Sequence, residues 1–291
     1  MVFMAILVNG LVSGGVYALL AIGFSLVFGA AKIANLAHTA FYMIGAYLLY
    51  MGIATLDLPL ILSFIIVLPI VVLLGVLTYK FLFYRVQEYE TAVMLIAIGL
   101  GLLVQEIVIL TYGTSPRHFD PFIAGFIEIG GTKILYQQMI AFGVSIFSLI
   151  GITTLLAKTR LGNAIRAVSQ DREAANLMGI DVRRISWIAM GISVLLAGIA
   201  GGVVSPMYTV TPHMWMDFFV VMIVAVVIGG LGSIKGSVIA AFALAFIETS
   251  VVNLAPGESY LKGVISLALL VGILFFRPEG LFGVSFEEER L

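Results

Sequence analysis

The amino-acid sequence predicts an all-α fold, a polytopic membrane bundle of about eight or nine transmembrane helices. Hydrophobic residues make up 62% of the 291 positions and charged residues only 11%, whereas a soluble domain carries roughly a quarter of its residues as Asp, Glu, Lys or Arg. Several uncharged runs reach the ~20 residues that a helix needs to span hydrocarbon. Only helices satisfy their backbone hydrogen bonds within such runs, so the crossings are expected to be helical.

Nine spans are expected along the chain, and residues 1–291 are expected to form a single membrane domain, because no soluble stretch of domain size interrupts them. The N-terminal segment lacks the basic region of a secretory signal, which predicts a retained first helix. Two places have an alternative interpretation, the first hairpin and the glycine-rich stretch 228–237. Each forms either two full crossings or a re-entrant or broken segment. The expected spans are roughly residues 4–28, 36–54, 58–82, 91–112, 136–157, 185–205, 216–233, 236–253 and 260–276.

One long charged loop, residues 158–184, separates the fifth and sixth spans and orients the bundle. It holds a concentration of Lys and Arg, and an excess of these residues marks cytoplasmic loops. Counting outward from this loop puts the N-terminus outside and the C-terminus in the cytoplasm. The other cytoplasmic positions are then Lys80, Arg85, Lys235, Arg277 and Arg290, and the external loops are residues 55–57, 113–136, 205–215 and 253–259.

Residues 163–178 of the charged loop are expected to form one helix, with Asn163 as its N-cap and Gly179 ending it in a left-handed conformation. A short helix that is apolar on one face and charged on the other has no core of its own. It either lies on the membrane surface or fits a groove on a partner protein. Its apolar residues are Ile165, Val168, Ala175, Leu177 and Met178.

Motifs for catalysis, nucleotide binding and metal binding are scarce. His38, His118 and His213 stand alone without HExxH spacing, and no segment has P-loop spacing, so any ATP is expected to bind to another subunit. The chain has no cysteine, which removes disulfides and thiol-ligated metals. The net charge of −1 gives no sign of nucleic-acid binding. We therefore expect no enzymatic centre, metal site or cofactor in this chain, and no nucleic-acid partner.

Two acids lie within expected spans, and an intramembrane acid is a functional hypothesis by default. A structural role is nevertheless favoured for both. Glu106, beside Gln105, is expected to bond a neighbouring helix, and Glu248 is expected to lie near enough to the external end to reach water. Asp217 stands at the start of a third span, far from both in sequence.

The string Glu173-Ala174-Ala175, followed after three residues by Gly179, resembles the EAA motif of ABC importer permeases. The later part of that motif, an Ile followed by Leu-Pro, is absent, which points to a divergent branch. Residues 166–180 are similar to the permeases for branched-chain amino acids, LivH and LivM, and the LivH type fits the chain length better. Three further stretches also resemble the permeases for branched-chain amino acids: residues 35–38 together with 45–47, residues 229–233 together with 236, and residues 277–283. Thr39 departs from the family, which usually has Gly at this position.

The resemblance implies one permease of an ATP-driven importer for branched-chain or related neutral amino acids, multi-pass in a prokaryotic inner membrane. It also implies a homologous LivM-like second permease, two cytoplasmic ABC ATPases that bind ATP and Mg, and an extracytoplasmic solute-binding protein. The helix in loop 158–184 is then the cytoplasmic coupling helix that docks onto an ATPase. The ATPase-coupling candidates are Arg166, Asp171, Glu173, Ala174, Ala175 and Gly179.

A path for a zwitterion with an apolar side chain needs apolar walls and a few uncharged polar groups. The translocation candidates are Asn9, Ser13, Asn35, His38 and Thr39, with Ser25 beside them. Interhelical hydrogen bonding, worth on the order of 1 kcal/mol each, is the alternative role, and His38 is the residue most favoured for transport. Urea and short amides remain alternative cargoes. Two other classes of membrane protein are alternatives to the ABC permease. One is a secondary transporter with Glu106 as its ion-coupling acid, and the other is a channel.

Overall fold

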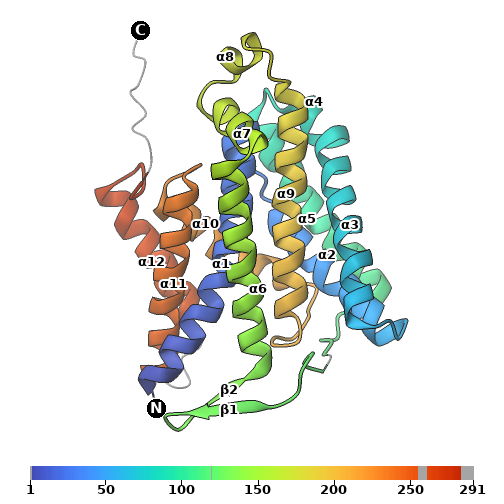
Figure 1. Cartoon of the computed structure of the whole chain (residues 1–291), viewed down its shortest axis with the longest axis vertical. Helices are drawn as coiled ribbons and strands as arrows, with labels where there is room; N and C mark the ends of the chain where they lie inside the picture. Colours follow the sequence, from blue (N-terminus) through green and yellow to red (C-terminus); the bar gives the residue numbers. More distant parts are fainter. Residues whose placement is uncertain (1, 119, 255–260, 283–291) are drawn as a thin grey trace.

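The computed structural model describes residues 2–118, 120–254 and 261–282. Within them the chain folds as a bundle of long helices with a β-hairpin at one end (Figure 1). The expectation of a polytopic helical bundle is confirmed at this level. The expectations for residues 255–259, Gly283 and Arg290 lie outside the described residues.

The helices follow one another along the chain with few long interruptions. Two of the helices named next, the second and the third, are each followed directly by a short π-helical turn. These turns span Met51–Thr55 and Tyr79–Phe83. In chain order the helices are α1 (Val2–Ala31), α2 (His38–Tyr50), α3 (Leu60–Thr78), α4 (Tyr84–Val86), α5 (Glu90–Tyr112), α6 (Tyr136–Lys158), α7 (Arg160–Gln170), α8 (Arg172–Leu177), α9 (Val182–Val204), α10 (Met214–Gly229), α11 (Ile234–Leu254) and α12 (Leu261–Phe276).

Two helices, α1 and α9, form the centre of the bundle. The 30 residues of α1 rise by 1.5 Å each, giving a helix of about 45 Å. This helix packs against α6, α9, α10 and α11, while α9 also packs against α2 and α3. Nearly all residues in the second half of α1 are buried. The apolar character of α1 on all sides therefore reflects its position in the core of the protein.

The close approach of α2 and α9 depends on glycine. A Cβ at Gly201 would collide with the Tyr42 carbonyl, and a Cβ at Gly45 would lie 2.9 Å from the Cα of Gly198. Small residues permit this kind of contact between membrane helices, where van der Waals packing replaces the hydrophobic effect as the driving force.

The stretch between α5 and α6 holds the only strands of the described residues. β1 (Phe126–Ile129) and β2 (Thr132–Leu135) form an antiparallel hairpin in which Phe126 pairs with Leu135. The expectation of an external loop at residues 113–136 did not include these strands, so the all-α expectation is incomplete here. Every residue of β1 is exposed, so no burial pattern marked the hairpin in the sequence.

Among the described residues, six helices are long and apolar enough to cross a membrane, and α10 and α12 are apolar but shorter. The helix positions match the expected spans to within a few residues. Within the glycine-rich stretch 228–237, residues 230–233 form a tight turn between the end of α10 and the start of α11. Nine crossings remain a prediction, because α2, α10 and α12 fall short of the length that a full crossing requires.

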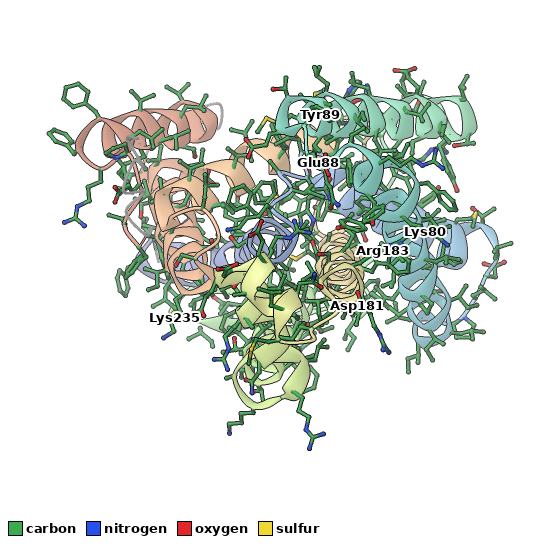
Figure 2. The ribbon with its side chains drawn as sticks, turned by 90° about the horizontal axis from the view of Figure 1, so that it is seen from above. Lys80, Glu88, Tyr89, Asp181, Arg183 and Lys235 are labelled. Atoms are coloured by element: carbon green, nitrogen blue, oxygen red, sulfur yellow. The ribbon has the colours of Figure 1, made fainter. Side chains whose placement is uncertain are left out.

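The segments expected to be cytoplasmic share one end of the bundle. Figure 2 looks onto that end, where Lys80, Asp181, Arg183 and Lys235 lie. Helices α7 and α8 extend from the same end, and the N-terminus and the β-hairpin lie at the opposite one (Figure 1). We call these the coupling end and the outer end.

Candidate functional site

The charged loop folds differently from its expected single helix. Helix α7 begins at Arg160 and its N-cap is Thr159, whose hydroxyl accepts a hydrogen bond from the Gly162 amide at 3.0 Å. Asn163 is therefore not the N-cap. It lies one turn inside the helix, where its side-chain oxygen accepts from Arg166 at 2.6 Å. The expectation failed because both Thr and Asn are good caps and the earlier one occupies the start of the helix.

A break at Asp171 divides the loop helix into α7 and α8. Asp171 has an extended backbone, and its carboxylate accepts hydrogen bonds from the Glu173 and Ala174 amides, both at 2.9 Å. This carboxylate caps a new helix, which is the usual role of Asp at this position. Gly179 has φ +83° and follows the end of α8, so the expected left-handed ending is confirmed.

Helix α8 is anchored to the bundle on one side and open on the other. Arg172 donates a hydrogen bond to the Ala31 carbonyl at the end of α1, at 2.8 Å, and Ala175 is buried. Glu173 and Ala174 are exposed. Beyond them lies an apolar tip of two side chains, Leu177 and Met178, which are 87% and 84% exposed. Figure 1 shows α8 as the part of the described coupling end that extends furthest from the bundle.

The start of α9 is held by cations stacked on aromatic rings at the same end. The Arg183 guanidinium lies 4.3 Å from the Tyr84 ring centre and 5.0 Å from that of Trp187. The Lys80 ammonium lies 5.8 Å from the Trp187 ring. Such contacts contribute roughly 0.5–1 kcal/mol each at exposed sites. They tie α9 to the segment after α3, so the coupling end has a defined shape around α8.

Three of the translocation candidates lie together in the closed core. His38, Thr39 and Asn35 are each at most 1% exposed. The His38 Nδ1 atom lies 3.1 Å from the Ser193 hydroxyl on α9, and the Asn35 amide donates to the sulfur of Met190 at 3.7 Å. Ser25 bonds Ser237 at 2.7 Å. These contacts join α1, α2, α9 and α11 within the bundle.

The other two candidates, Asn9 and Ser13, line a separate cavity of about 190 Å³ near the outer end, which we call the outer cavity. The Asn9 side-chain oxygen accepts a hydrogen bond from Gln138 at 2.9 Å. Ser13 also borders a narrower pocket with Tyr17 and Phe218. Sequence reasoning missed the residues that complete the outer cavity from α6, α11 and the segment after α9, namely Gln138, Met207, Tyr208, Thr249, Val252 and Asn253.

Neither acid behaves as expected. Glu248 does not reach water: it is 2% exposed and accepts hydrogen bonds from the Tyr17 hydroxyl at 2.9 Å and the Ser266 hydroxyl at 2.5 Å. Glu106 is exposed, and its neighbour Gln105 makes the interhelical bond instead, accepting from the Trp215 indole at 2.9 Å. Adjacent residues of a helix point about 100° apart. Gln105 therefore faces the neighbouring helix while Glu106 points away from it.

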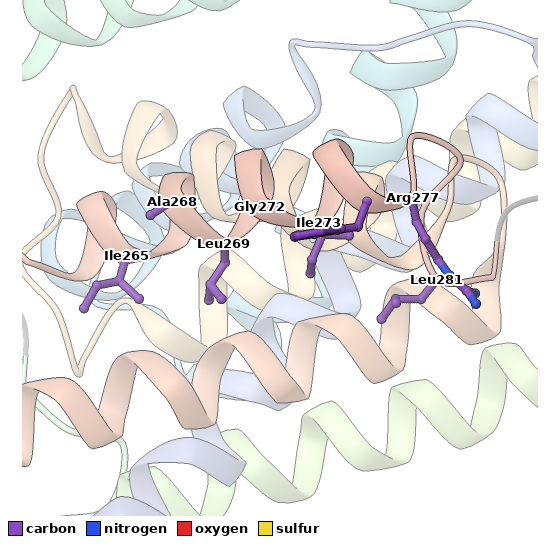
Figure 3. A pocket seen from close by; sticks show the side chains of 8 residues that line it. Ile265, Ala268, Leu269, Gly272, Ile273, Arg277 and Leu281 are labelled. Atoms are coloured by element: carbon purple, nitrogen blue, oxygen red, sulfur yellow. The ribbon is translucent and has the colours of Figure 1, made fainter.

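A further groove of about 590 Å³ runs along α12 (Figure 3). Its walls are apolar apart from the Arg277 guanidinium at one end. A zwitterion needs several convergent polar groups for its orientation. The outer cavity offers such groups and the groove does not, so the outer cavity is the better candidate for contact with an amino acid.

Comparison with known proteins identifies the family. A sequence model described as the branched-chain amino acid transport system permease component matches residues 6–274. The chain belongs to this family of permeases. It is 30% identical to the LivH permease of the high-affinity branched-chain amino acid transport system of Escherichia coli K12, over 97% of this chain and 96% of that protein. It is 29% identical to the BraD permease of Pseudomonas aeruginosa, over 95% and 94% of the two chains.

The fold of the permease also matches a solved structure. PsaBC from Streptococcus pneumoniae in complex with Fab superimposes with a TM-score of 0.54 at 12% identity, covering 94% of this chain and 92% of that one. At this identity the likeness concerns the fold alone. The family match makes the chain a membrane transport component and not an enzyme, and the expectation of no enzymatic centre is confirmed by these relatives.

Proposed function

We propose that this permease is the LivH-type membrane subunit of an ATP-driven importer, carrying leucine, isoleucine, valine or related neutral amino acids inward by alternating access. The family match over residues 6–274 is the observation that carries the proposal. The near-complete coverage of LivH and BraD relatives agrees with it. The protein would sit in a prokaryotic inner membrane, with its coupling end and C-terminus in the cytoplasm, because the basic residues gather at that end.

The partners follow from the same proposal. Two cytoplasmic ATPases would bind and hydrolyse ATP with Mg, since this chain has no P-loop. A LivM-like second permease would complete the path, and an extracytoplasmic binding protein would deliver the solute. Nine crossings would place the outer cavity on the side of the binding protein.

The coupling candidates take distinct roles in this proposal. Leu177 and Met178 would enter an apolar groove of the ATPase, with Glu173 and Ala174 on the contacting surface beside them. Asp171 and Gly179 would fix the start and end of α8, and Arg172 would pass its movement to α1 through the Ala31 carbonyl. Coupling of this kind requires that α8 make different contacts in two states of the transporter.

The translocation candidates divide into two groups. Asn9 and Ser13 would meet the amino acid in the outer cavity, whose lining mixes amide, hydroxyl and apolar groups. His38, Asn35 and Thr39 would act from the core by holding α2 against α1 and α9. Transport would then depend on His38 through helix packing, without direct contact in this closed arrangement.

Purification from the native membrane in mild detergent, followed by mass spectrometry, tests the proposal. Two P-loop ATPases and a second permease are expected to co-purify. Truncation of the apolar tip by Leu177→Ser and Met178→Ser should release the ATPases and retain the second permease, whereas Phe147→Ser on the exposed face of α6 serves as a matched control. Recovery of the chain without ATPases would contradict the proposal.

A further inference from the structure

Helix α2 begins in the middle of the bundle. His38, its first residue, lies beside α9, with 3.1 Å between the His38 Nδ1 atom and the Ser193 hydroxyl. Ser193 is the middle residue of α9, which is long and apolar enough to cross a membrane. Further along α2, Gly45 approaches Gly198 on the outer half of α9. The chain therefore enters the middle of the membrane as a non-helical segment, residues 32–37, and continues to the outer end as a half-length helix.

A helix N-terminus at this depth favours an anion. The aligned peptide dipoles give the start of a helix a partial positive charge, and no side chain caps the 13-residue helix α2. In transporters, helices that begin near the middle of the membrane direct this end at anionic groups of the substrate. The His38 amide bonds within the turn, to the Asn35 carbonyl at 3.0 Å, so hydrogen bonds to a ligand would come mainly from side chains.

The side chains around this N-terminus lack hydrogen-bond partners. Among the described residues, eight buried side-chain nitrogen or oxygen atoms have none. Half of these atoms belong to one short stretch of chain, and their residues are each at most 1% exposed. Buried polar groups are normally paired, and leaving them unpaired is unfavourable. The four atoms are Asn35 Oδ1, His38 Nε2, Thr39 Oγ1 and the Tyr42 hydroxyl oxygen.

The unpaired atoms match the two charged ends of an amino acid. The Thr39 hydroxyl can donate a hydrogen bond to a carboxylate, and so can a protonated ring nitrogen of His38. The Asn35 side-chain oxygen accepts hydrogen bonds only, which suits an ammonium group with its three donors. The positive end of the helix dipole also favours the carboxylate over the ammonium at Thr39.

The contacts that close this region are weak. The Asn35 amide donates only to the thioether sulfur of Met190, at 3.7 Å, and a thioether is a weak acceptor. The His38 Nε2 atom lies against α1 at Gly23, which has no side chain to bond it; a Cβ there would be 2.7 Å from this nitrogen. Parting α2 from α1 or α9 would therefore let the unpaired atoms gain hydrogen bonds that they lack in the closed arrangement.

We propose that the start of α2, with Asn35, His38 and Thr39, binds the transported amino acid in an opened state of the permease. The carboxylate lies at the helix N-terminus with Thr39 and His38, and the ammonium group lies at the Asn35 side-chain oxygen. This site is further inward than the outer cavity. The inference rests on the proposed function, because it takes the cargo to be an amino acid, and it goes beyond the packing role of these residues in the closed arrangement.

The absence of cysteine permits a direct test in the complete complex. Thr39→Cys introduces a single thiol at the site, and its rates of reaction with anionic and cationic methanethiosulfonates are compared with and without ATP. Reaction requires the thiolate, and hence water. The thiol is expected to react during ATP hydrolysis, to react faster with the anionic reagent, and to be protected by excess leucine.

The control thiol, Ala241→Cys on α11, replaces a residue that is as fully buried as Thr39 and should stay unreactive under all these conditions. A thiol at position 39 that never reacts would overturn the inference. A reaction rate that neither ATP nor leucine changes would also overturn it, as would a preference for the cationic reagent.

Uptake measurements separate binding from packing. Thr39→Val removes the hydroxyl and nearly keeps the shape of the side chain, so leucine uptake by the reconstituted complex should fall about fivefold, the factor for one hydrogen bond of about 1 kcal/mol. Thermal stability should not fall, because the hydroxyl has no partner in the closed arrangement. Thr39→Ser should restore most of the rate. Thr153→Val is the matched control with full uptake, since the Thr153 hydroxyl donates within α6, to the Leu149 carbonyl at 2.7 Å.

Full uptake by Thr39→Val would overturn the inference and leave the proposed function intact. A fall in uptake with a parallel fall in thermal stability would assign Thr39 to packing and would overturn it as well. Failure of the unaltered complex to carry leucine would contradict the proposed function itself.

Discussion

Replacing Gly179 by valine tests how the coupling end works. Gly179 has φ +83°, a left-handed conformation that costs an ordinary L-residue about 1–2 kcal/mol and a β-branched residue more. An added Cβ would meet no atom within 4 Å, so the penalty comes from the backbone alone. The strain is expected to shift α8 and its apolar tip out of position. A loss of 1–2 kcal/mol weakens a contact by roughly 5- to 30-fold.

The assay compares ATPase co-purification and ATP-dependent leucine uptake for Gly179→Val, Gly179→Asn and the unaltered permease. The valine variant should insert normally and lose transport, and the asparagine variant should be milder because Asn tolerates the left-handed region. Gly143→Val on α6, also with open space at its Cβ, controls for side-chain size. Normal uptake and ATPase recovery for Gly179→Val would refute the reasoning.

Three further substitutions probe separate parts of the molecule. Glu248→Ala leaves the Tyr17 hydroxyl without its acceptor and should lower the free energy of unfolding by about 1–3 kcal/mol, measured by denaturation in detergent; stability equal to the unaltered protein would contradict this role. His38→Ala should preserve assembly and ATP hydrolysis and reduce uptake, and unchanged uptake would remove His38 from the transport account. Leu177→Ser should weaken ATPase binding without changing thermal stability, since the side chain is 87% exposed; ATPase binding at the unaltered level would exclude the apolar tip as the contact.

The positions of the helices could be predicted from the sequence because hydrophobic length is a strong signal. Uncharged runs predicted the long helices to within a few residues, and the glycines at 229–236 marked the turn between α10 and α11. The β-hairpin was missed because its first strand is exposed throughout and leaves no alternating pattern. The split of the loop helix was also missed: Asp171 is unfavourable within a helix and favourable at its start, but good helix formers on both sides of it masked this signal.

The residues of the candidate sites were harder to predict. The EAA-like string lies on α8, and local sequence forms this helix and its ending at Gly179; its role in coupling stays a prediction. The outer cavity combines α1, α6, α11 and the segment after α9, so its members are distant in sequence and only Asn9 and Ser13 were anticipated. The exchange of roles between Glu106 and Gln105 depended on helix rotation, which an apolar helix exposed on several sides does not fix by its pattern.

Leucine uptake into proteoliposomes tests the central claim most directly. The permease is reconstituted with its co-purified second permease and ATPases, and the binding protein supplies labelled leucine. Uptake is predicted to require ATP and to be competed by isoleucine and valine, with urea having no effect. Uptake without ATP, driven by an ion gradient, would contradict the account, as would competition by urea with no competition by branched-chain amino acids.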